Sequence, residues 1–121
     1  MMEFPDAETV VMDLLQQVAY SCTMAGPDTP MPHIRVARTG GTDDDVTDFP
    51  EVEVECFAES AAEAKSMAKR CRKLIEDAAA TKVNGILIDD TGCLVGPMQI
   101  PDIDPDDRRL IATYQLLMRR Q

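Results

Sequence analysis

A strand followed directly by a helix in the middle of the chain constrains the fold more than any other feature. In the strand, Val52, Val54 and Cys56 alternate with glutamates. A period of two gives a strand one buried face and one face in water. Residues 60–63 then read Ser-Ala-Ala-Glu, a capping box that opens a helix. Apolar residues at helical spacing predict its buried face: Ala64, Met67, Ala68, Cys71, Leu74, Ile75 and Ala78.

An earlier strand is expected at residues 33–39, where Ile34 and Val36 alternate with other side chains. If it pairs with the glutamate-bearing strand, Arg35 lies near the glutamate row. Opposite charges across such strands contribute about 0.2–1 kcal/mol each. Residues 39–48, between the two strands, are rich in aspartate and predict a long acidic hairpin loop.

The two ends of the chain supply a further helix and more extended segments. Residues 5–19 predict a first helix with one apolar stripe. Residues 86–98 predict an extended segment, either with a bulge at Gly92 or as two short strands around residues 90–92. Residues 108–119 predict a last strand with two largely apolar faces, which suits a central strand or one covered by another chain.

Together these elements predict an α/β fold of the α+β type, in the order α-β-β-α-β-β. We expect one domain over residues 1–121, built as a four-stranded, largely antiparallel twisted sheet that carries two helices.

The charge balance argues against several function classes. The chain has 22 acidic and 12 basic residues, a net charge of −10. Such a surface repels phosphate groups, so we expect neither specific nucleic-acid binding nor membrane binding. No apolar run approaches the roughly 20 residues of a membrane-spanning helix. The first residues lack the basic and apolar regions of a signal peptide, which predicts a protein made and kept in a cytoplasm.

The four cysteines do not form a metal-binding pattern, because no CxxC pair occurs and the chain has one histidine. We expect free thiols at least partly buried, although an even number of cysteines also permits a disulfide framework. The four are Cys22, Cys56, Cys71 and Cys93.

The aspartate clusters are the candidates for a metal site or an acid–base pair. Residues 102–107 match the start of an EF-hand loop, but Asp107 and Thr113 stand where that loop needs Gly and Glu. Asp89 and Asp90 are adjacent on an extended segment, so their side chains point to opposite faces. We therefore expect no metal, no cofactor and no catalytic residue, and a protein that is not an enzyme.

Two arginine pairs stand out in this acidic chain, at residues 108–109 and 119–120. Surface ion pairs are one interpretation, and docking onto an acidic patch of a neighbouring subunit is the other. The aspartates of residues 43–45 are likewise either a flexible charged loop or one side of such an interface. The candidate subunit interface comprises Asp43, Asp44, Asp45, Arg108, Arg109, Ile111 and Leu117.

Several short motifs follow one another along nearly the whole chain. They are FPDAE (4–8), VARTGGTDD (36–44), TDFPEVEV (47–54), VNGILIDD (83–90), GP (96–97) and RRLIATYQL (108–116). In this order they resemble the tail terminator proteins of long-tailed phages that infect actinobacteria.

The resemblance implies a structural virion protein without catalytic residues. Such a protein forms a hexameric ring that caps the finished tail tube, ends tube polymerisation and provides the surface for head–tail joining. The implied partners are further copies of the chain, the tail tube protein and the head–tail connector protein. The implied location is the tail–neck junction of the virion, after assembly in the host cytoplasm, with DNA passing through the ring.

Two alternatives stay open. Another phage neck component, such as a head-closure or adaptor protein, shares this size and acidity but binds on the portal side. A small α/β regulatory domain that binds a metabolite should instead show one apolar pocket with convergent polar groups.

Overall fold

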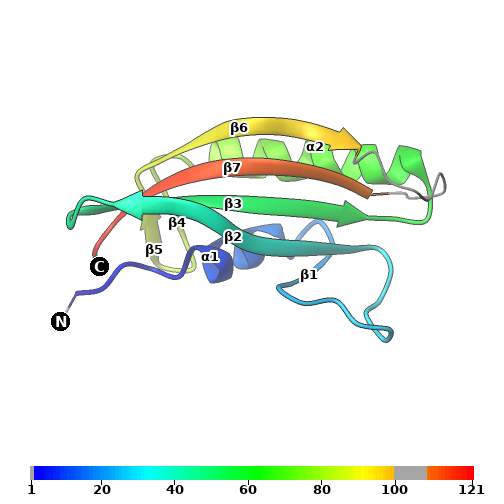
Figure 1. Cartoon of the computed structure of the whole chain (residues 1–121), viewed down its shortest axis with the longest axis horizontal. Helices are drawn as coiled ribbons and strands as arrows, with labels where there is room; N and C mark the ends of the chain where they lie inside the picture. The colour runs from blue at the N-terminus through cyan, green and yellow to red at the C-terminus, as the bar shows by residue number, and fades with distance from the viewer. Residues whose placement is uncertain (1, 100–108) are drawn as a thin grey trace.

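The computed structural model describes residues 2–99 and 109–121, and within them two helices lie on one face of a sheet (Figure 1). This confirms the α+β class and the two helices. The elements are α1 (Ala7–Leu15), β1 (Tyr20–Cys22), β2 (His33–Asp43), β3 (Thr47–Phe57), α2 (Ala61–Asp77), β4 (Thr81–Val83), β5 (Ile86–Ile88), β6 (Asp90–Gln99) and β7 (Arg109–Arg119).

The main sheet has five strands in the order β1-β2-β3-β7-β6, and β4 and β5 form a separate hairpin. β1 runs parallel to β2, whereas the other neighbours are antiparallel. The four-stranded sheet and the order α-β-β-α-β-β were therefore wrong in detail. β1, β4 and β5 have three residues each, too few for an alternating pattern to reveal them. Asn84 and Gly85, both with positive φ, make the tight turn between β4 and β5.

The hairpin between β2 and β3 is longer and its loop shorter than expected. The expected loop of residues 39–48 is wrong, since β2 runs to Asp43 and β3 starts at Thr47. The Arg38 guanidinium of β2 donates to both Asp48 carboxylate oxygens of β3, at 2.8 and 2.9 Å. The two strands are thus joined by an ion pair across the segment that was expected to be a loop. Gly41 has φ +93°, and a Cβ there would lie 2.1 Å from the Phe49 carbonyl oxygen. The glycine thus continues the paired strand instead of ending it.

The segment after the β4–β5 hairpin breaks at Asp89, which separates β5 from β6. The expected bulge at Gly92 is wrong, because Gly92 pairs in register with Gln115. The register shifts instead between Cys93 and Val95 and again before Met98. The alternative of two strands in this segment is closer to the structure.

Both helices begin with the side-chain caps that their sequences predict. The Ser60 hydroxyl accepts from the Glu63 backbone N–H at 3.1 Å, and the Asp6 carboxylate accepts from the Glu8 backbone N–H at 3.1 Å. α1 is shorter than the expected residues 5–19, since it ends at Leu15. The Gln16 side chain then donates to the Ser21 carbonyl and so holds the turn into β1.

The core lies between the helices and the sheet. The expected α2 face is buried except at Leu74, which is only partly buried, so its expected full burial is wrong. The four thiols are free, two of them buried and two half-buried, as predicted. The largest fully buried side chains include Tyr114, Leu15, Ile34, Ile75, Ile88, Leu116 and Met118.

Candidate functional site

The sheet face opposite the helices, which we call the open face, carries a charged network. Arg35 of β2 donates to the Glu55 carboxylate at 2.6 Å and lies 3.8 Å from the Glu53 carboxylate. The Arg109 guanidinium of β7 approaches the other Glu55 oxygen at 3.6 Å and lies 5.8 Å from the centroid of the Phe57 ring. Burial, followed by the neighbouring Glu55 charge, raises the pKa of Glu53. The expected contact between Arg35 and the glutamate row is thus present.

Apolar side chains accompany this network towards the edge strand β6. Ile111 and Leu117 of β7 are half-buried on the open face. Met98 of β6 is the cross-strand partner of Ile111 and is exposed, as are Leu94 and Val95. These residues give the β6 edge an apolar character that suits contact with another protein.

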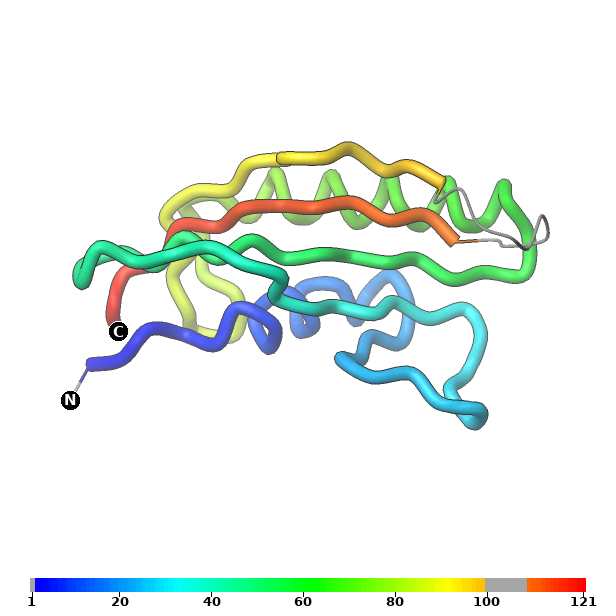
Figure 2. The backbone as a smooth tube through the Cα atoms, in the orientation of Figure 1, coloured from blue at the N-terminus to red at the C-terminus, as the bar shows by residue number. Residues whose placement is uncertain are grey.

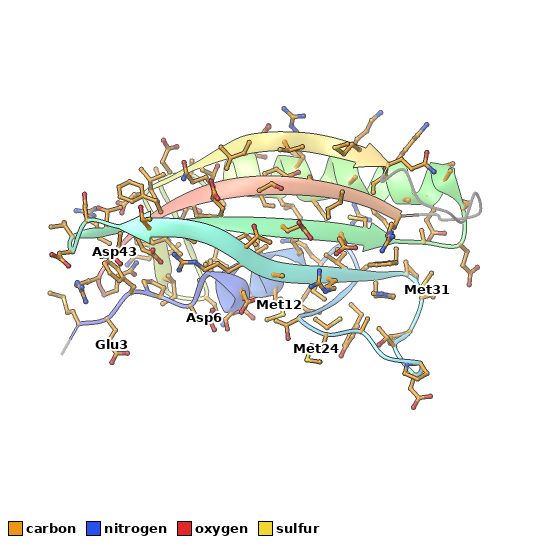
Figure 3. All side chains as sticks on the ribbon, viewed as in Figure 1. Glu3, Asp6, Met12, Met24, Met31 and Asp43 are labelled. Carbon is orange, nitrogen blue, oxygen red and sulfur yellow. The ribbon has the colours of Figure 1, made fainter. Side chains whose placement is uncertain are left out.

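The aspartates of residues 43–45 lie at the tip of the β2–β3 hairpin, at one end of the molecule (Figure 3). The Asp44 carboxylate accepts from the Thr47 N–H at 2.7 Å and the Val46 N–H at 3.1 Å, and these bonds lower the pKa of Asp44. The Asp43 carboxylate accepts from the Asp45 N–H at 3.0 Å. These bonds make the tip an ordered turn whose carboxylates have a defined arrangement.

A groove between α2 and β6 was not recognised in the sequence. It has a volume of about 450 Å³, and its lining residues are Lys65, Ala68, Lys69, Arg72, Pro97, Met98, Gln99 and Leu110. In the sequence alone, Lys65, Lys69 and Arg72 would be assigned to a solvent-exposed helix face, because nothing indicates that β6 passes beside them. Their spacing of four and three residues, which places them on one side of a helix, was the available signal.

Two parts of the predicted interface, the hairpin tip and Arg109, do not meet within one chain. The hairpin tip lies at one end of the long sheet, and Arg109 lies at the other end, where β7 begins and β6 finishes (Figure 2). Arg108 lies outside the described residues. An ion pair between the tip and Arg109 therefore requires a second copy of the chain.

The second arginine pair has partners within the chain. The Arg119 guanidinium bonds to the Asp89 carboxylate at 2.8 Å, and this contact lowers the pKa of Asp89. Arg120 lies 4.0 Å from the centroid of the Phe4 ring and donates to the Asp45 carbonyl at 2.8 Å. These arginines secure the terminal segment and the hairpin tip.

Within residues 2–99 and 109–121, no group of three or more His, Cys, Asp or Glu side chains is placed to hold a metal ion. In the same residues, no helix has the length and apolarity needed to cross a membrane. The features that the structure offers are thus surfaces: an acidic tip, a basic groove and an open sheet face.

A family model described as "Phage tail termination protein" matches residues 3–121. The chain belongs to the phage tail termination protein family. No curated protein matches the chain. The resemblance to tail terminator proteins seen in the sequence is thereby confirmed, and the protein is a structural component of a phage tail.

Proposed function

We propose that this protein caps the phage tail tube as a hexameric ring, ends tube polymerisation and provides the surface for head–tail joining. The observation that carries the proposal is the family match over residues 3–121. The proposed partners are other copies of the chain, the tail tube protein and the head–tail connector protein. The proposed location is the tail–neck junction, after assembly in the host cytoplasm.

The charge distribution supports contact between successive copies. The three aspartates of the tip and Arg109 at the start of β7 lie at opposite ends of the sheet, so a tip can meet Arg109 only in a neighbour. A head-to-tail contact of this kind closes into a ring when its rotation divides a full turn. We keep Asp43, Asp44, Asp45, Arg108 and Arg109 as candidates for this contact, beside the apolar Ile111 and Leu117.

Deletion and add-back test the function. Lysates of the parent phage without this protein should contain overlong or headless tails, and purified protein should restore joining. An Arg108→Glu, Arg109→Glu variant that still folds should restore joining poorly. If tails have normal length and carry heads without the protein, the proposal is wrong. Normal tail length together with a failure only in joining would favour a head-closure or adaptor protein.

DNA binding gives a second test. A ring through which DNA slides should not hold phosphates, and a net charge of −10 disfavours such binding. Fluorescence anisotropy at physiological salt should show no saturation with duplex or single-stranded DNA. Saturable binding at micromolar protein would contradict the proposed passage of DNA through the ring.

A further inference from the structure

We propose that the groove between α2 and β6 receives the β2–β3 hairpin tip of a second copy of this chain. The inference rests on the proposed ring and specifies the contact that would build it. It also replaces Arg109 as the main site for the tip, since Arg109 already contacts Glu55 and Phe57 in its own chain.

The groove offers two lysine ammonium groups that form no ion pair within residues 2–99 and 109–121. Among the residues that the structure describes, neither the Lys65 nor the Lys69 ammonium forms an ion pair, and both side chains are exposed. Arg72 bonds to the Glu76 carboxylate through Nε at 2.8 Å, and its Nη1 lies 3.6 Å from where a Cβ on Gly96 of β6 would be. Ala68, Leu110 and other apolar residues also line the groove. The site therefore suits a ligand with carboxylates beside an apolar group.

The hairpin tip has this chemistry. Three consecutive aspartates precede Val46, which is 63% exposed although it is apolar. The turn is already held by hydrogen bonds from its own backbone, so little conformational freedom is lost on docking. Carboxylates of the tip can face Lys65 and Lys69 while Val46 covers the apolar lining.

The position of the two sites requires the tip to come from another copy. The tip lies where β2 turns into β3, whereas the groove lies beside the last residues of β6, at the far end of the sheet (Figure 1). In a chain with ten more acidic than basic residues, most surfaces repel an acidic tip, and this groove attracts one. Each copy then presents one tip and one groove, which is the arrangement that a ring needs.

Charge exchange tests the contact. The tip variant Asp43→Lys, Asp45→Lys removes the Asp43 bond from the Asp45 N–H but keeps the Asp44 carboxylate with its two bonds from Val46 and Thr47. The groove variant is Lys65→Glu, Lys69→Glu. Each variant alone should weaken self-association by about tenfold or more, measured by sedimentation velocity, and should fail to restore head–tail joining. An equimolar mixture should restore both, because tips and grooves of opposite charge alternate in a ring with an even number of subunits. One chain that carries all four changes should also assemble, to within about threefold of the parent.

Each variant has a control with the same change in net charge. The double variant Glu3→Lys, Asp13→Lys is the control for the tip variant, and the double variant Lys73→Glu, Lys82→Glu is the control for the groove variant. All these side chains are exposed and lie outside both sites. The controls should assemble as the parent does, and circular dichroism should show that every variant folds. The contact is wrong if the controls lose as much as the variants, or if exchange in one chain does not restore assembly. Loss of joining without rescue by exchange would mean that a different acidic protein occupies the groove.

The test separates this contact from the proposed function. If the parent protein restores joining but the tip and groove variants do so equally well, the contact is wrong and the function stands. If the parent protein itself has no effect on tails, the function fails whatever the variants do.

Discussion

The two faces of the five-stranded sheet are stabilised in different ways. On the covered face, Val54 and Tyr114 are almost fully buried against the helices, and Ile75 of α2 is almost fully buried against the sheet. On the open face, no helix of the described residues lies over the strands, and side chains such as Arg35 and Glu55 neutralise one another instead. The difference teaches that this sheet is stabilised by apolar packing on the covered face and by ion pairs on the open face. Substitutions should therefore affect the two faces differently.

The largest effect is expected on the covered face. Ile75→Ala removes a side chain that is 1% exposed, and should lower the free energy of unfolding by about 2–5 kcal/mol. Leu74→Ala should cost about half as much, because Leu74 is only partly buried. Lys73→Ala, with an exposed side chain, should cost under about 0.5 kcal/mol. Urea melts of the three variants measure this order, and equal effects of Ile75→Ala and Lys73→Ala would contradict the assigned helix face.

A smaller effect is expected from the open face. Glu55 is 7% exposed and contacts both Arg35 and Arg109. Glu55→Gln leaves the shape nearly unchanged but removes the charge shared by two arginines, and should cost about 1–3 kcal/mol. Glu51→Gln, on the same face and strand but with no ion pair in the described residues, is the matched control. If the two variants melt at the same urea concentration, the network does not stabilise the open face.

The smallest effect is expected at the end of the sheet, and it depends on pH. Arg119 lowers the pKa of Asp89 below its ordinary value of 3.8. A lowered pKa in the folded state adds stability above pH 3.8, and this contribution disappears as the pH falls through the folded-state pKa. Asp89→Asn should therefore destabilise slightly at pH 7 and less at pH 3. Urea melts at both pH values check this, and Arg119→Gln should show the same pH dependence if the ion pair is its source.

The sequence predicted the covered face well because apolar periodicity reports burial directly. The alternation of Val52 and Val54 and the capping box at Ser60 correspond to a strand and a helix in the structure. Prediction failed for the hairpin loop, where strand pairing and an ion pair override the turn preference of the residues. Gly40 and Gly41 are ordinary turn formers, yet here they continue β2, since the strand partner and the Arg38 ion pair hold them.

The candidate site was only partly predictable, because it depends on contacts that are remote in sequence. The unusual density of aspartates indicated the acidic tip. The groove exists only because β6 pairs with β7 and so passes beside α2. No local pattern at Lys65 or Lys69 distinguishes a groove wall from a solvent-exposed helix face. The topology had to be known before these cations could be assigned a role.

The contact between two thiols in the core has a consequence for the durability of the particle. Cys56 of β3 and Cys71 of α2 lie with their sulfurs 3.9 Å apart, and this contact together with burial raises the pKa of Cys71. Oxidants react with the thiolate, so a thiol held in its protonated form inside the core is nearly inert. The Cys56–Cys71 contact between β3 and α2 should therefore keep both thiols reduced in a reducing cell interior and in the oxidising surroundings that a released virion meets.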